Sequence, residues 1–188
     1  MDNETLVIGI TGYKRSGKDT VGKIIKQYYD QQGYKCRKYM LADLIKRTLC
    51  KLTGLSITGL ENIKDSKIIE DPSFTYRDAL IAFADRYKEK HGKEVHYNYT
   101  KGQILKDQPD VAIITDIRYP FESELFRRDF NTKIIRVIRP GINVDMSHSS
   151  ETSIDEIDPD YIVVNDGSII DLENKVNEVL NQIHLPTE

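Results

Sequence analysis

The residues whose types and spacing could do chemistry begin at Gly12, in the nonapeptide GYKRSGKDT that ends at Thr20. Two glycines five positions apart, followed at once by Lys18, are typical of a loop that turns tightly and brings backbone N–H groups to phosphate oxygens. The apolar run 6–10 precedes the loop and a helical pattern follows it, so the positive end of a helix would face the same anion. We therefore expect a phosphate-binding loop (P-loop) here.

The metal ligand of this loop is ambiguous. Asp19 stands where Ser or Thr usually binds Mg²⁺, and Thr20 follows it. A carboxylate suits a hard cation at least as well as a hydroxyl does, so Asp19 could hold Mg²⁺ directly or through water while Thr20 bonds a phosphate. The alternative is that Asp19 merely caps the following helix.

Size and composition favour a single enzyme domain over residues 1–188. The net charge of −3, from 27 basic and 30 acidic residues, argues against a nucleic-acid partner, since such proteins usually carry a basic excess. Cys36 and Cys50 lack the spacing of a disulfide framework or a zinc site, so a reduced, cytoplasmic setting is expected. The acidic N-terminus resembles neither a signal peptide nor a membrane span.

Short apolar runs alternate with helical periodicity, which favours parallel strands joined by crossover helices. The expected fold is α/β, a three-layer fold of the P-loop NTPase type with a roughly five-stranded parallel sheet. Strands are expected at 6–10, 35–41, 111–115, 133–138 and 161–164, and helices at 20–32, 42–52, 76–90, 120–128 and 169–183. Residues 54–72 are expected to be irregular.

A second candidate site follows the third strand, where Asp116 and Arg118 come just after Thr115. In open α/β folds, ligands bind at the carboxyl ends of the strands. Asp116 could hold the water shell of Mg²⁺ or accept a hydrogen bond from the P-loop, and Arg118 could clamp a phosphate. The alternative is that Asp116 caps the next helix beside an exposed Arg118.

A long polar segment, about 139–160, follows the fourth strand and is expected to be a lid. Arg139 at its root could stack on a base or neutralise a transferring phosphate. His148 and Glu151 either serve the lid or belong to a helix cap.

After the last strand, Asn165, Asp166 and Gly167 form a turn that could approach an adenine ring. A plain turn explains the same residues, because Asn, Asp and Gly are common turn formers and Ser168 is a good helix cap.

Together these residues resemble a known family. The chain is similar to the bacteriophage-type deoxynucleoside monophosphate kinases, which share a P-loop fold with animal-type phosphomevalonate kinases and, more distantly, with dephospho-CoA kinases. The motifs that carry the resemblance are GYKRSGKDT (12–20), LADLIK (41–46), TDIRYPFE (115–122), RVIRPG (136–141), SHSSE (147–151) and VNDGS (164–168).

The resemblance implies a role for each matched position. The ATP phosphates would be bound by Gly12, Lys14, Arg15, Ser16, Gly17, Lys18, Asp19 and Thr20. An acceptor-binding region, about 42–108, would contribute Asp43, Lys46 and Arg77, with Asp116 and Arg118 added from the third strand. The lid and adenine site would use Arg139, His148, Glu151, Asn165, Asp166 and Gly167. Lys18, Arg77, Arg118 and Arg139 would be catalytic, and Mg²⁺ would be held by Asp19 or Asp116.

The implied reaction transfers the γ-phosphoryl group of ATP to a deoxynucleoside 5'-monophosphate. The helix after Arg77 lacks the Gln and Gly that relatives often carry there, so phosphomevalonate and dephospho-CoA stay open as acceptors. Without the resemblance, Lys46 and Arg77 read equally well as solvated helix charges. A non-enzymatic, nucleotide-gated binding protein is the other alternative, although the NKxD signature of guanine-binding switches is missing from the sequence. No membrane partner is expected, and a homodimer stays open.

Overall fold

The computed structural model describes residues 5–68, 71, 73–142 and 152–185. The chain divides into two compact units. The sheet unit comprises Met1–Met40 and Gln103–Glu188, and the helical unit comprises Leu41–Gly102. That the whole chain acts as one domain stays a prediction.

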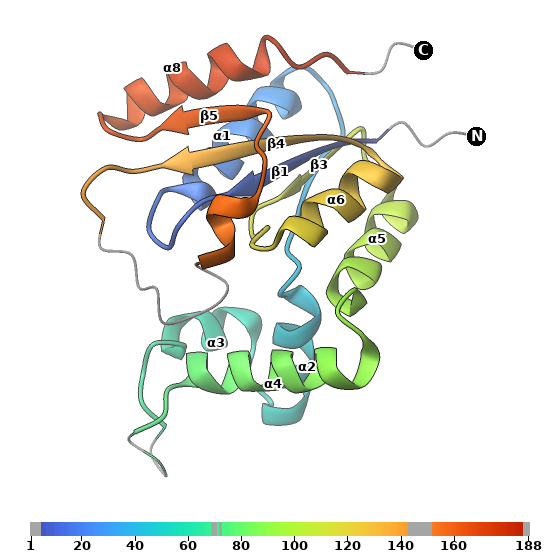
Figure 1. The fold of residues 1–188 in the computed structure, drawn as a ribbon, viewed down its shortest axis with the longest axis vertical. Helices are drawn as coiled ribbons and strands as arrows, with labels where there is room; N and C mark the ends of the chain where they lie inside the picture. The colour runs from blue at the N-terminus through green and yellow to red at the C-terminus, as the bar shows by residue number, and fades with distance from the viewer. Residues whose placement is uncertain (1–4, 69–70, 72, 143–151, 186–188) are drawn as a thin grey trace. The chain divides into compact units, whose positions relative to one another are not determined.

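A five-stranded parallel sheet forms the centre of the sheet unit (Figure 1). Its strands are β1 (Leu6–Thr11), β2 (Cys36–Tyr39), β3 (Val111–Ile114), β4 (Asn131–Ile138) and β5 (Tyr161–Val164), arranged in the order β2-β3-β1-β4-β5. Every residue of β1 is buried, as expected for a central strand covered on both faces. The connections run to one side of β1 and then to the other, so β1 ends at the kind of switch point where α/β sheets bind ligands.

Helices cover both faces of this sheet. Helices α1 (Lys18–Gln31) and α8 (Ile169–Leu180) pack together on one face, while α6 (Pro120–Asp129) lies on the other, against β4 (Figure 1). A short 3₁₀ helix, η1 (Ser153–Glu156), precedes β5. The core under α1 and α8 includes Leu6, Ile8, Ile10, Val21, Ile25, Val163, Leu172 and Val176. The P-loop is thereby mounted on a rigid, buried strand.

The helical unit contains α2 (Asp43–Thr53), α3 (Ile57–Ile63), α4 (Tyr76–His91) and the first turns of α5 (Val95–Asp107) (Figure 1). Ser56 caps α3, because its side chain accepts a hydrogen bond from Gly59 N–H. Thr75 and Asp78 form a capping box at the start of α4. These caps fix the residues at which α3 and α4 begin. They thereby also fix the positions of the charged residues on both helices.

The five predicted strands and five predicted helices are confirmed, but within the described residues two α-helices and the 3₁₀ helix η1 were missed. Helix α3 lies inside 54–72, which was expected to be irregular, and it buries only Leu60 among its seven residues. Helix α5 turns His96, Tyr97 and Thr100 inward. Because a histidine and a threonine occupy this inner face, α5 shows little of the apolar periodicity that predicts helices.

The described parts of the chain include no helix with both the length and the apolar character needed to cross a membrane. Cys36 and Cys50 are free thiols. Burial raises the pKa of Cys36 to about 12, so this thiol stays protonated and unreactive at neutral pH.

Burial of His96 predicts an acid-sensitive helical unit. The pKa of His96 lies below its ordinary value of 6.5, mainly because of burial and then because of Lys88, although the backbone of Ala84 and Leu41 opposes the shift. The unfolded chain therefore binds more protons than the folded chain as the pH falls below about 6.5, and the free energy of unfolding should decrease there. Urea denaturation across that range should show this slope, and His96→Gln should lose it.

The matched control is His91→Gln, which replaces an exposed histidine of the same unit. The comparison uses the slope and not the absolute stability, so a general destabilisation by His96→Gln does not obscure the result. An unchanged slope in His96→Gln would contradict the assignment.

Candidate functional site

The P-loop, residues 12–17, connects β1 to α1 in a conformation that needs glycine. Gly12 and Gly17 have φ values of 144° and 105°, in the region that favours glycine, and Arg15 adopts a φ of 69°. A Cβ on Gly12 would lie 2.4 Å from the carbonyl oxygen of Val137 and 2.9 Å from Ser16 Oγ. The loop therefore lies directly on the end of β4.

Protein donors hold the carbonyl oxygens of this loop. Lys18 Nζ donates to the carbonyl oxygens of Gly12, at 2.5 Å, and Tyr13, at 2.6 Å. The backbone N–H of Ser16 also donates to Tyr13 O, at 3.1 Å, and Asn165 Nδ2 donates to Ser16 O, at 2.9 Å. Successive N–H groups in such turns make an anion-binding concavity. The carbonyl oxygens are thus occupied by protein donors, and the Lys18 ammonium group already lies against the loop.

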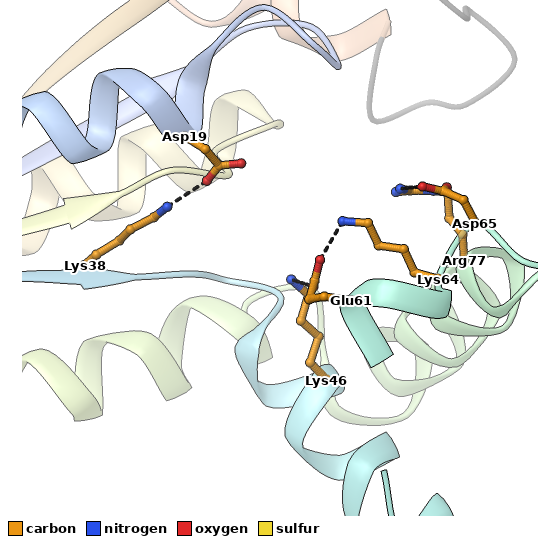
Figure 2. Close-up of polar contacts among 7 residues, drawn as sticks. All are labelled: Asp19, Lys38, Lys46, Glu61, Lys64, Asp65 and Arg77. Carbon is orange, nitrogen blue, oxygen red and sulfur yellow. Dashed lines mark hydrogen bonds and ion pairs between the residues drawn. The ribbon is translucent and has the colours of Figure 1, made fainter. Parts of the chain in front are cut away.

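Asp19 lies in the first turn of α1, with its side chain 80% exposed and 2.7 Å from Lys38 Nζ (Figure 2). The N-cap of α1 is Gly17, without a side-chain hydrogen bond, so the alternative that Asp19 merely caps the helix is wrong. Among the described residues no three acidic, histidine or cysteine side chains group into a metal site. One exposed carboxylate beside a phosphate loop still fits Mg²⁺, which is usually held by one or two carboxylates together with substrate phosphates.

Asp116 and Arg118 lie half-buried in the turn between β3 and α6. Glu122, almost fully buried, accepts hydrogen bonds from the backbone N–H groups of Arg118, at 2.9 Å, and Tyr119, at 3.1 Å. The N-cap of α6 is Tyr119, with Glu122 at its third position, so Asp116 is not the capping residue. The turn is held in place at the carboxyl edge of the sheet.

A link between the P-loop and η1 was missed by sequence reasoning. Tyr13 Oη donates to Asp155 Oδ2 at 2.5 Å, although the two residues are 142 positions apart. Arg136, in β4, donates through Nη2 to the carbonyl oxygens of Ile154, at 2.9 Å, and Ile157. An arginine inside a buried strand was the one signal that could have revealed this link.

The residues predicted for the lid and adenine site have mixed outcomes. Arg139 is exposed just after β4, and His148 and Glu151 lie outside the described residues. Asn165 contacts the P-loop, and Asp166 accepts a hydrogen bond from Lys175 at 2.5 Å. Gly167 precedes Ser168, which caps α8 as expected. The contact of this turn with adenine stays a prediction.

The predicted acceptor residues of the helical unit all pair with opposite charges. Asp43 Oδ2 lies 2.5 Å from Nε of Arg47, which is one turn further along α2. Lys46 Nζ lies 2.6 Å from Glu61 Oε1, and Arg77 Nε lies 2.6 Å from Asp65 Oδ1 (Figure 2).

Three further P-loop residues were predicted to bind phosphate. Lys14 and Arg15 are exposed, and Thr20 is half-buried.

A P-loop between the central strand and the first helix of a five-stranded parallel sheet defines an α/β protein of the P-loop NTPase class. Solved structures show the same fold. A Thermus thermophilus protein aligns with a TM-score of 0.51 and 17% identity, over 96% of this chain and 99% of that one. A thymidylate kinase of Ehrlichia chaffeensis aligns with a TM-score of 0.51 and 12% identity, over 94% of this chain and 98% of that one.

The chain belongs to the deoxynucleotide monophosphate kinase family, whose model matches residues 6–70 and 88–176. A protein of Acanthamoeba polyphaga mimivirus, provisionally named a deoxynucleotide monophosphate kinase, is 23% identical over 91% of this chain and 94% of its own length. The deoxynucleoside-5'-monophosphate kinase of Escherichia phage T5 is 39% identical over 57 residues, which are 27% of this chain and 23% of that protein. The resemblance read from the motifs is thereby confirmed, and the protein is a nucleotide kinase.

The hydrogen bond from Asn165 to Ser16 O predicts a role in shaping the P-loop. Replacing Asn165 with Ala removes one hydrogen bond, worth about 1 kcal/mol, so the KM for the nucleotide donor should rise roughly fivefold. Binding of inorganic tripolyphosphate, measured by calorimetry, should weaken by a similar factor, because the effect acts on the phosphates.

The matched control is Asn181→Ala, which removes an asparagine that accepts from Tyr28 Oη at 2.9 Å. It should leave both ligands unaffected. If Asn165→Ala weakened the binding of the nucleotide donor but not that of tripolyphosphate, Asn165 would act on the base and not on the loop.

Proposed function

We propose that the protein transfers the γ-phosphoryl group of ATP to a deoxynucleoside 5'-monophosphate and releases the diphosphate. The observation that supports this most is the P-loop, with Lys18 inside it and its carbonyls held by protein donors. Membership of the deoxynucleotide monophosphate kinase family supports the acceptor class.

Phosphoryl transfer requires positioning and charge neutralisation more than covalent chemistry. The loop N–H groups and the start of α1 would bind the β- and γ-phosphates of ATP. On ATP binding, Lys18 would exchange its two carbonyl acceptors for phosphate oxygens and stabilise the charge that develops on the transferring group. Arg118 and Arg139 are proposed to neutralise the same charge.

Magnesium, bound with ATP, would supply further neutralisation of the phosphate charge. We assign Asp19 as its ligand, directly or through water, and Asp116 as a second carboxylate at the edge of the sheet. Lys38 would then exchange Asp19 for solvent or phosphate, since its ammonium group already lies beside that carboxylate.

The acceptor would be bound by Asp43, Lys46 and Arg77 of the helical unit, together with Asp116 and Arg118. Lys46 and Arg77 are cations suited to the 5'-phosphate, and Arg77 can bind it through two parallel hydrogen bonds as it now binds Asp65. The base that the acceptor carries, a cytoplasmic setting and a homodimer stay predictions.

The proposed reaction is tested by coupled ADP release from Mg-ATP with each deoxynucleoside and ribonucleoside monophosphate added singly, beside phosphomevalonate and dephospho-CoA. Stimulation by one or a few deoxynucleotides is the expected result. Stimulation by phosphomevalonate or dephospho-CoA alone would mean that this compound, and not a deoxynucleotide, is the acceptor. If no compound changed the rate of ADP release although ATP still bound, the protein would be a nucleotide-gated binding protein.

Lys18→Ala should lower kcat/KM about 100- to 1,000-fold, the usual effect of removing one preorganised donor, about 2.7–4 kcal/mol. The fold should survive, because Lys18 is half-buried at the start of a helix and outside the apolar core. The coupled assay measures the loss, and circular dichroism checks the fold.

Lys26→Ala provides the control, because Lys26 is another lysine of α1 and forms an exposed pair with Asp30. It should keep full activity. Normal turnover in Lys18→Ala would contradict the proposed mechanism.

A further inference from the structure

Two lysines from different segments converge on one carboxylate in the helical unit. Lys46, on α2, places Nζ 2.6 Å from Glu61 Oε1, and Lys64, just after α3, places Nζ 2.5 Å from Glu61 Oε2 (Figure 2). Each carboxylate oxygen thus has its own ammonium partner. The arrangement resembles the way in which two cations bind two oxygens of a phosphate.

The start of α4 is fixed beside these lysines. The backbone N–H of Arg77 donates to the carbonyl oxygen of Lys64 at 2.7 Å. The Arg77 guanidinium binds Asp65 through Nε, at 2.6 Å, and Nη2, at 3.2 Å. The cluster formed by Lys46, Lys64, Arg77, Glu61 and Asp65 therefore contains three cations and two carboxylates.

The charges of this cluster are partly withdrawn from water. The side chains of Lys46, Glu61 and Lys64 are 17%, 32% and 33% exposed. Burial alone would raise the pKa of Glu61, but the hydrogen bond from Lys64 and the ammonium charges of Lys46 and Lys64 outweigh it and leave the pKa below its ordinary value. The carboxylate is therefore ionised at neutral pH, and it separates two ammonium groups that would otherwise repel each other.

A single carboxylate is a weak partner for two lysines. Joining α2 to α3 needs only one ion pair, and a second ammonium on the same carboxylate adds repulsion between the lysines. A phosphomonoester carries a charge of about −1.5 to −2 at neutral pH and offers three acceptor oxygens. It would satisfy both ammonium groups better than Glu61 does.

We propose that Glu61 holds the place of the acceptor's phosphate, and that Lys64 is a binding residue for that phosphate beside Lys46. The inference rests on the proposed function, because it adds to its acceptor site a residue that sequence reasoning did not select. On binding, the phosphomonoester displaces Glu61 toward solvent, which its partial exposure allows, and both lysines turn to the phosphate oxygens.

The proposal predicts effects of opposite sign for two neighbouring residues. Glu61→Gln removes the competing charge, so the Kd and KM for the deoxynucleotide should fall about threefold to tenfold with kcat and the KM for ATP unchanged. Lys64→Gln should raise the KM for the deoxynucleotide about tenfold or more. Calorimetric titration of the full chain with the deoxynucleotide that supports turnover measures the Kd.

Arg86→Gln is the matched control, because it breaks an exposed ion pair with Glu89, three residues on, in the same unit. It should change none of these constants. If Glu61→Gln weakens deoxynucleotide binding or leaves it unchanged, Glu61 only ties α2 to α3 and the proposal is overturned.

A measurement on the unsubstituted protein covers the case in which Glu61→Gln fails to fold. The ¹⁵N signal of the Lys64 ammonium group, assigned with Lys64→Arg, should shift on addition of the deoxynucleotide and not on addition of the deoxynucleoside that lacks the phosphate. No shift at saturation would overturn the proposal.

Failure of the proposed function and failure of the role of Glu61 give different results. A chain that binds and turns over no deoxynucleotide overturns the proposed function and this inference with it. Normal turnover combined with weaker binding by Glu61→Gln overturns the role of Glu61 alone.

Discussion

The close approach of the P-loop to the end of β4 is the constraint on which the site depends. Only a residue without a Cβ fits at Gly12, because the carbonyl oxygen of Val137 lies where that atom would be. The loop must then turn within a few residues, and its carbonyl oxygens are held by Lys18 and Asn165 from two directions. The parallel sheet supplies this geometry, since β1, β4 and β5 all end at the same edge.

Three lysines of the proposed site are held by acceptors that belong to the protein. Lys18 binds loop carbonyls, Lys38 binds Asp19 and Lys46 binds Glu61. A half-buried cation without a partner would be unfavourable, so these contacts stabilise the protein without a ligand. In the proposed mechanism, ligand binding exchanges one acceptor for another, and the affinity reflects the free-energy difference between the two. A strongly charged phosphate gains most from such an exchange.

The sequence was sufficient for the features that rest on local pattern. The P-loop, the strands of the sheet and the cap at Ser168 follow from glycine spacing, apolar runs and capping chemistry, and the structure has them. Helix α5 escaped because its buried face uses His96 and Thr100 instead of apolar residues. The contacts of Asn165 and Arg136 join residues distant in sequence, and no local pattern encodes such a pairing. Lys64 falls in a segment that was expected to be irregular, and only the ion pairs with Glu61 show that it lies beside Lys46.

The hydrogen bond from Tyr13 to Asp155 couples two segments that the linear sequence keeps far apart. Any ligand that changes this bond on entering the P-loop also changes the free energy that holds η1 in place, and thermodynamic linkage makes the effect reciprocal. The environment of position 13 is thus set partly at position 155, where the short helix is further fixed by Arg136. A redesign of the loop would therefore need to vary Tyr13 and Asp155 together.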